Sequence, residues 1–195
     1  MIARFDQLTA TGVPLGKNDV DTDQIIPARF LKGTVKTGLG EKLFYDWRYA
    51  EDGSPRADFV LNDRKYQGGK ILVARNNFGC GSSREHAVWA LKDYGFCAVL
   101  AVSFADIFRN NALKNGLLPI ALTASLIDQL LSITMKEAPP QIKIDLPTQQ
   151  ISLLGQTLSF EVDPFRKKCL LEGLDDIGYT LRHTDAITRY ESAHK

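Results

Sequence analysis

One glycine-rich segment, residues 76–87 with the sequence NNFGCGSSREHA, constrains the fold of this chain more than any other. A mostly apolar stretch of strand character, residues 70–75, precedes it, and apolar residues at largely helical spacing follow over residues 87–94. Gly95 then predicts the end of that helix, and residues 97–102 are almost wholly apolar, as in a strand buried on both faces. The pattern therefore predicts a βαβ unit.

The turn inside this unit has the chemistry of an anion-binding site. Its two glycines allow backbone conformations that other residues avoid and let a ligand approach closely. Ser82 and Glu85 have the S-x-x-E spacing of a capping box, which predicts that the helix begins near Ser82 or Ser83. A helix N-terminus attracts anions, and Arg84 can hold a carboxylate through two hydrogen bonds. We therefore expect a carboxylate or a phosphate as the ligand.

The same segment allows a simpler interpretation, in which Ser82 only caps the helix and Arg84 is a solvated surface residue. Nucleotide-binding motifs fit less well. The third glycine of a dinucleotide fingerprint is missing, because Arg84 follows Gly79 and Gly81 at that place, and no phosphate-loop motif occurs in the chain.

Composition limits the remaining classes of function. A length of 195 residues suits one domain, and 44% hydrophobic with 24% charged residues is typical of a soluble globular chain. The net charge of +1 gives no electrostatic argument for a nucleic-acid or membrane partner. No apolar run approaches the roughly 20 residues that span a bilayer, and no secretory leader is recognisable at the N-terminus.

Cys80, Cys97 and Cys169 are widely spaced and form no C-x-x-C pair or zinc pattern. They predict a reducing, cytoplasmic location, and they argue against an iron–sulfur cluster held by this chain alone. We interpret Cys80 as a small residue fitted to a tight turn rather than as a nucleophile.

Three aspartates, Asp19, Asp21 and Asp23, precede the segment Gln24-Ile25-Ile26. They do not form a calcium loop, because Gln24 and Phe30 stand where that loop needs glycine and glutamate. The local interpretation is an Asx-rich turn followed by a short strand that starts at Gln24.

The remaining pattern predicts one domain over residues 1–195, with a helical tail at 164–195. Glycine and proline punctuate residues 32–69, and loops of this length are often lids or binding loops. Periodicity predicts the other elements: an opening strand within 1–13, helices at 104–115, 125–136, 164–173 and 176–191, and strands at 117–122, 142–146, 151–153 and 157–162.

Residues 77–87 resemble the signature of the swivelling domain of the aconitase superfamily. Residues 19–30 (DVDTDQIIPARF), 103–111 (SFADIFRNN) and 115–119 (NGLLP) extend the resemblance in the same order over nearly the full chain. The resemblance implies an α/β fold of the β/β/α swivelling type with a short helical C-terminal tail.

The resemblance also implies a hydro-lyase of leucine biosynthesis, which interconverts 2-isopropylmalate and 3-isopropylmalate by dehydration and rehydration. It assigns Ser82 as the catalytic base. Asp23 corresponds to an aspartate implied to orient a histidine of a partner chain. Ser83, Arg84 and Gly81 correspond to substrate-binding positions. Positive charge must stabilise the Ser82 alkoxide, because an ordinary serine hydroxyl is a very weak base.

Arg29 is the candidate for a second carboxylate contact, although the corresponding arginine of the aconitases falls a few residues later, within 32–36. The resemblance makes residues 32–69 the substrate-recognition loop, with Val35 or Leu39 as an apolar wall for the substrate side chain.

No metal or cofactor is expected in this chain. The resemblance places a [4Fe–4S] cluster on a larger partner protein, in a heterodimer or a higher assembly that acts on a small dicarboxylic hydroxy acid. Two alternatives stay open. One is the small subunit of a related hydro-lyase for methylmalate, citraconate or homoaconitate-like acids. The other is a non-catalytic anion-binding or regulatory module, possible RNA binding included, although Lys and Arg are dispersed and balanced by acids.

Overall fold

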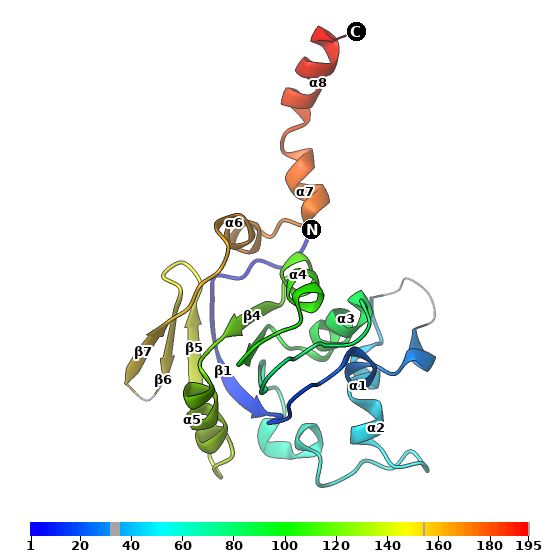
Figure 1. Ribbon diagram of the computed structural model, residues 1–195, viewed down its shortest axis with the longest axis vertical. Coiled ribbons are helices and arrows are strands. Elements are labelled where there is room, and N and C mark those ends of the chain that lie inside the picture. The colour runs from blue at the N-terminus through cyan, green and yellow to red at the C-terminus, as the bar shows by residue number, and fades with distance from the viewer. Residues whose placement is uncertain (32–35, 154, 195) are drawn as a thin grey trace.

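The structure is a computed structural model that describes residues 1–31, 36–153 and 155–194 (Figure 1). In this part of the chain the strands form one mixed seven-stranded sheet with the order β4-β3-β2-β1-β5-β6-β7. The first four strands of that order are parallel, and β5, β6 and β7 extend the sheet from β1 in antiparallel fashion. The strands are β1 (Gln7–Pro14), β2 (Ile71–Val73), β3 (Ala98–Ala101), β4 (Leu118–Ala121), β5 (Gln141–Asp145), β6 (Gln150–Leu153) and β7 (Gln156–Ser159).

The pattern of apolar and polar residues explains why one half of the sheet is covered on both faces and the other half on one face. Every residue of β2 and β3 is buried, as expected for parallel strands covered on both faces. In β5, by contrast, Ile142 and Ile144 are buried while Gln141 and Lys143 are exposed, the alternation of a strand with one wet face. Pro119 lies in β4, where an edge strand tolerates a residue without an N–H.

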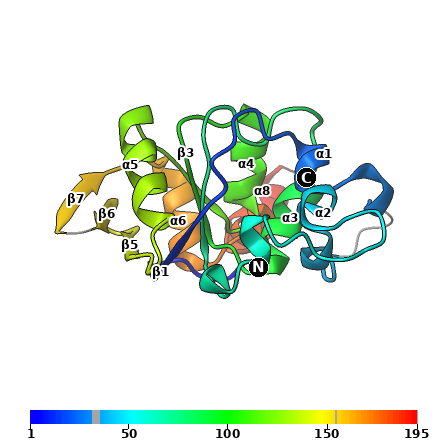
Figure 2. The same ribbon diagram turned by 90° about the horizontal axis from the view of Figure 1, so that it is seen from below.

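The helices cover the sheet and extend beyond it. Two clusters of buried apolar side chains form the core, one containing Phe44, Leu72 and Leu91 and the other containing Leu100 and Leu130. Figure 2 shows β5, β6 and β7 at one end of the molecule and α1 and α2 at the other. The helices are α1 (Thr22–Ile25), α2 (Tyr45–Arg48), α3 (Glu85–Tyr94), α4 (Asp106–Lys114), α5 (Ala124–Thr134), α6 (Pro164–Glu172), α7 (Asp176–Leu181) and α8 (Thr184–Ala193).

The last two helices extend away from the sheet toward the C-terminus (Figure 1). The prediction of one helix over 176–191 is wrong, because the chain breaks between α7 and α8. At the break, the Thr184 hydroxyl donates a hydrogen bond to the carbonyl of Leu181, which competes with continued helical pairing. Within the described residues, no helix combines the length and the apolar character that crossing a bilayer requires.

The predicted strand at Gln24 is also wrong, because the segment forms the short helix α1. The Asp21 carboxylate accepts hydrogen bonds from the N–H groups of Asp23 and Gln24, and the Gln24 side chain accepts one from the Asp21 N–H. This reciprocal cap satisfies the free amides of the helix start and explains why a helix forms there.

Candidate active site

Loops that follow three parallel strands meet at one edge of the sheet. Gly79 N–H donates to Val20 O at 2.7 Å and Thr22 N–H donates to Cys80 O at 2.9 Å, so the loop after β2 lies against the loop after β1. Phe78 N–H donates a hydrogen bond to Ser103 O at 3.0 Å, so the loop after β2 also lies against the loop after β3. Ligands of open α/β sheets bind at the carboxyl ends of the strands, where these loops lie.

Two glycines of this turn are required by its geometry. Gly79 has φ +78°, and a Cβ added there would lie 2.5 Å from Cβ of Phe108 and closer still to the ring. Gly81 has φ +85°, and a Cβ there would lie 3.3 Å from Cβ of Asp21. Both residues therefore adopt a backbone conformation that other residues rarely tolerate. At Gly79 there is also no room for a Cβ.

The start of α3 differs from the prediction. The helix begins at Glu85 with Arg84 as its N-cap, and no side chain caps it, so the predicted capping box and the interpretation of Ser82 as only a cap are wrong. Arg84 N–H instead donates to the Ser82 carbonyl at 2.8 Å, and the Glu85 carboxylate accepts a hydrogen bond from Asn115 Nδ2 at 2.6 Å. The exposed Ser82 hydroxyl is consequently not used as a cap.

No sequence pattern predicted the contact of Glu85 with Asn115, because the two residues lie 30 positions apart. Asn115 Oδ1 also accepts a hydrogen bond from Trp89 Nε1 at 3.0 Å. Asn115, at the C-terminal end of α4, therefore holds the N-terminal part of α3 in place.

Arg84 forms an ion pair with Asp23, its Nη1 bonding Oδ1. The same oxygen accepts the N–H of Ala28 at 3.0 Å. The hydrogen bond from Arg84 is the main cause that lowers the pKa of Asp23, so its carboxyl is ionised at neutral pH. Among the described residues, none accepts a hydrogen bond from Nε or Nη2 of Arg84. The structure thus brings Ser82, Ser83, Arg84 and Asp23 together.

Arg29 is held elsewhere. Both of its terminal nitrogens bond the Asp46 carboxylate, and its guanidinium lies 4.7 Å from the centre of the Phe30 ring and 5.5 Å from that of Tyr45. It lines a cavity of about 620 Å³ together with Arg56 and other residues of the 45–56 segment. In this conformation Arg29 pairs with Asp46 and makes no hydrogen bond to the described residues of the Ser82 turn.

The segment predicted as a substrate-recognition loop is only partly described. Val35 lies outside the described residues, and Leu39 is half-buried against the apolar cluster beside α3. Gly40 N–H donates to the Asp93 carboxylate at 2.7 Å, and a Cβ on Gly40 would lie 2.6 Å from the Tyr94 nitrogen. This part of the segment is therefore seated firmly on the C-terminal end of α3.

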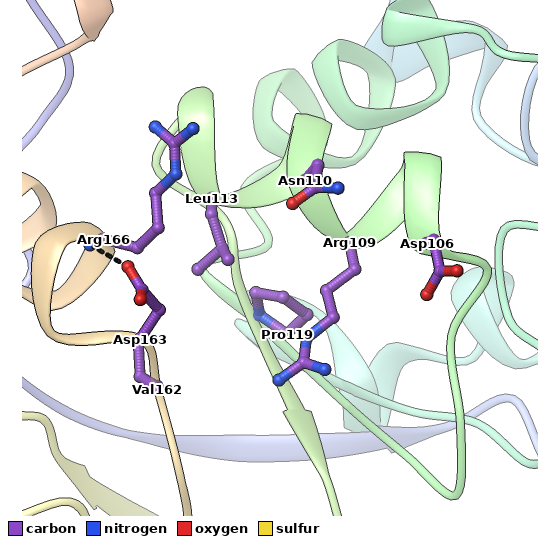
Figure 3. Close-up of a pocket in the computed structure, with 8 residues that line it drawn as sticks. All are labelled: Asp106, Arg109, Asn110, Leu113, Pro119, Val162, Asp163 and Arg166. Atoms are coloured by element: carbon purple, nitrogen blue, oxygen red, sulfur yellow. Dashed lines mark hydrogen bonds between the residues drawn. The ribbon is translucent and has the colours of Figure 1, made fainter.

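A separate cavity of about 500 Å³ lies between α4, β4 and the start of α6 (Figure 3). Two arginines and two aspartates line it, so it carries no excess charge of either sign, and no residue of the Ser82 turn reaches it. Its lining residues are Asp106, Arg109, Asn110, Leu113, Pro119, Val162, Asp163 and Arg166.

The cysteines do not form a metal centre. Cys80, Cys97 and Cys169 are all free, and within the described ranges no group of three or more His, Cys, Asp or Glu side chains could hold a metal ion. Burial raises the pKa of the Cys80 thiol, and nearby Asp21 and Asp19 raise it further, so the nucleophilic thiolate is disfavoured. The residues that the structure describes therefore do not fit an iron–sulfur cluster.

Comparison with known proteins identifies the family. The model of the aconitase C-terminal domain matches residues 2–125, and the model of the C-terminal domain of the 3-isopropylmalate dehydratase small subunit matches residues 176–195. The 3-isopropylmalate dehydratase small subunit of Roseiflexus castenholzii is 55% identical, over 96% of this chain and 92% of that protein. The protein of the same name from Magnetococcus marinus is 51% identical, over 98% and 94%.

A solved structure gives the same result. The crystal structure of 3-isopropylmalate dehydratase from Methanocaldococcus jannaschii superposes with a TM-score of 0.68 at 28% identity, covering 94% of this chain and 99% of that one. These matches confirm the predicted α/β fold of the aconitase C-terminal type. The chain therefore belongs to the family of 3-isopropylmalate dehydratase small subunits.

Proposed function

We propose that this chain, with a large subunit, forms a dehydratase that interconverts 2-isopropylmalate and 3-isopropylmalate in leucine biosynthesis. The observation that carries the proposal is the exposed Ser82–Ser83 turn beside an arginine fixed by Asp23, at the carboxyl ends of parallel strands. An open position of this kind suits a site that is covered by a second protein chain, and we place the reaction between the two subunits, in the cytoplasm.

Arg84 binds one substrate carboxylate in this proposal. Its Nη1 is engaged by Asp23, so Nε and Nη2 are the donors directed to the substrate. The Ser83 hydroxyl and the backbone at Gly81 complete the contact, since Gly81 lets the ligand approach the chain closely. The ion pair also keeps the guanidinium in place before substrate arrives, which lowers the entropic cost of binding.

Ser82 is the base that removes the carbon-bound proton. Its hydroxyl is exposed and is not used to cap α3, so it is available to a substrate held on Arg84. The Arg84 charge and the positive end of the helix both favour the alkoxide over the hydroxyl. Both sources of positive charge lie within two or three residues of Ser82 in the chain.

Asp23 and Arg29 have supporting roles. Asp23 Oδ1 is occupied by Arg84 and Ala28, which leaves Oδ2 to orient a histidine from the large subunit. Arg29 is proposed as the second carboxylate contact, and this requires its pair with Asp46 to open when substrate binds.

We assign the [4Fe–4S] cluster to the large subunit, because the described residues of this chain have no side-chain group that could hold one. When bound, such a cluster supplies a Lewis acid for the departing hydroxyl. Residues 32–69 are proposed to contact the substrate side chain, and a substrate with one methylene fewer or more is expected to change binding by only about 1–3 kcal/mol.

Reconstitution tests the function. We expect no dehydratase activity from the isolated chain and activity on isopropylmalate when the large subunit is added. Dehydratase activity of the iron-free chain alone contradicts the proposal. A panel with methylmalate, citraconate and homoaconitate separates the related hydro-lyases, and no activity on any of them favours an anion-binding module.

Arg84→Lys tests the carboxylate contact. Lysine keeps the charge but loses the planar fork, and a hydrogen bond to a charged group contributes about 1.5–3 kcal/mol. We therefore expect kcat/KM of the reconstituted enzyme to fall roughly 10- to 150-fold. Arg182→Lys, at the exposed pair with Glu172, is the matched control and should leave kcat/KM unchanged. An unchanged value for Arg84→Lys removes Arg84 from the site.

A further inference from the structure

We infer that Thr22 is a positioning residue, which holds the turn that carries Ser82 in its reactive orientation. The inference rests on the proposed function for its kinetic consequence, but the contact that carries it is independent of any substrate. The Thr22 hydroxyl donates a hydrogen bond to the Ser82 carbonyl at 3.0 Å, across 60 positions of sequence.

Burial singles out this side chain. Among the described residues, Thr22 and Thr134 are the polar residues that are buried, and Thr22 is 2% exposed. Its backbone N–H donates to Cys80 O at 2.9 Å, so Thr22 bonds the serine loop at two carbonyls on either side of Gly81. The buried Thr22 hydroxyl is therefore held between its own helix and the serine loop, and the part-buried hydrogen bond to the Ser82 carbonyl satisfies it.

The Ser82 carbonyl receives a second hydrogen bond, from Arg84 N–H at 2.8 Å. Two donors on one oxygen set the plane of the peptide that follows Ser82, and Arg84 closes a three-residue turn over Ser83. Gly81, with φ +85°, has no Cβ to restrict the chain on the other side. The direction of the Ser82 hydroxyl therefore depends on the Thr22 contact.

Thr22 also connects the two sides of the site. It is the first residue of α1, and the next residue, Asp23, pairs with Arg84. Its hydroxyl therefore holds the Ser82 carbonyl while its neighbour holds the guanidinium. Nothing in the spacing of DTD predicted this role, because the contact partner lies on another loop.

Thr22→Val tests the inference in the chain reconstituted with its large subunit, since valine keeps the shape and removes the donor. Misplacement of a reacting group by about 1 Å can cost about 100-fold. We expect kcat to fall at least about tenfold while KM changes little, and Thr22→Ser to retain kcat within about twofold. Thr134→Val is the control: its hydroxyl donates only to Leu130 O and Leu131 O within α5, so kcat should stay unchanged.

Amide hydrogen exchange of the same chain separates this inference from the proposed function. Loss of the Thr22 donor should accelerate exchange at Arg84 N–H, whose acceptor is the Ser82 carbonyl, whereas Thr134→Val should not. Unchanged exchange with unchanged kcat in Thr22→Val overturns the inference, as does a failure of Thr22→Ser to retain kcat. Full activity of Ser82→Ala together with accelerated exchange in Thr22→Val contradicts the proposed function alone and leaves the positioning contact supported.

Discussion

Gly79→Ala is the substitution that most directly tests the geometry of the turn. Gly79 combines a left-handed backbone, φ +78°, with direct contact to the buried side chain of Phe108. Alanine must therefore accept an unfavourable conformation and displace an aromatic ring at the start of α4. Gly68 offers a matched control, because it has φ +77° and, apart from its chain neighbours, no atom of the described residues lies within 4 Å of the position a Cβ would take.

The two contributions can be separated by comparing the variants. The left-handed conformation costs a non-glycine residue about 1–2 kcal/mol, and this term applies to both glycines. Forcing an extra methyl group into a packed core costs a further 1–3 kcal/mol or so, and this term applies only at Gly79. We expect Gly68→Ala to lower the free energy of unfolding by about 1–2 kcal/mol and Gly79→Ala by about 2–5 kcal/mol.

Urea denaturation followed by circular dichroism measures both values, and Tm gives a second readout. For a chain of this size 1 kcal/mol corresponds to about 2–4 °C, so Gly79→Ala should melt roughly 2–12 °C below Gly68→Ala. In a Phe108→Ala background, which removes the ring, the penalty of Gly79→Ala should shrink. Equal losses for the two single variants, or no relief from Phe108→Ala, refute the argument from close approach.

Two further predictions concern ion pairs. Arg166 is the main cause that lowers the pKa of Asp176, so this carboxylate stabilises the fold above its unfolded pKa of about 3.9 and loses that effect as pH falls through the lower folded value. Because Asp176 is half exposed, Asp176→Asn should cost less than about 1 kcal/mol in urea unfolding at pH 7 and progressively less as the pH is lowered, and a cost that does not change with pH contradicts this. In the reconstituted enzyme, Asp46→Asn should free Arg29 and leave KM unchanged or lower, whereas Arg29→Ala should raise KM about tenfold; a wild-type KM for Arg29→Ala excludes it from substrate binding.

Short-range sequence pattern was sufficient to predict several strands and helices of this fold. The apolar run that became β3, the alternation of β5 and the Pro164 to Gly173 limits of α6 were all predicted, because burial and capping act over a few residues. The break before Thr184 and the helix after Asp21 were missed, because side-chain hydrogen bonds outweighed the periodicity there.

The site shows the same limit. Sequence chemistry predicted an anion-binding turn with Arg84, and the resemblance added Asp23, but neither showed that the two form an ion pair. The start of α3 was misplaced because Glu85, which matched a capping box locally, is engaged by Asn115 on a distant helix. The contact between Thr22 and the Ser82 carbonyl was likewise invisible until the loops after β1 and β2 were placed side by side.

The central position of β1 has a consequence for biosynthesis. Of the strands in this sheet, β1 leaves the ribosome first. Its two neighbours, β2 and β5, begin only at Ile71 and Gln141 and are synthesised later. At roughly 5–20 residues per second, the second edge of β1 stays open for about 6–25 s. Gly12 and the terminal Pro14 make the strand a poor template for amyloid-like association during that interval. A nascent chain that stalls before β5 is therefore expected to depend on chaperones, whereas one that has passed Asp145 can close its own sheet.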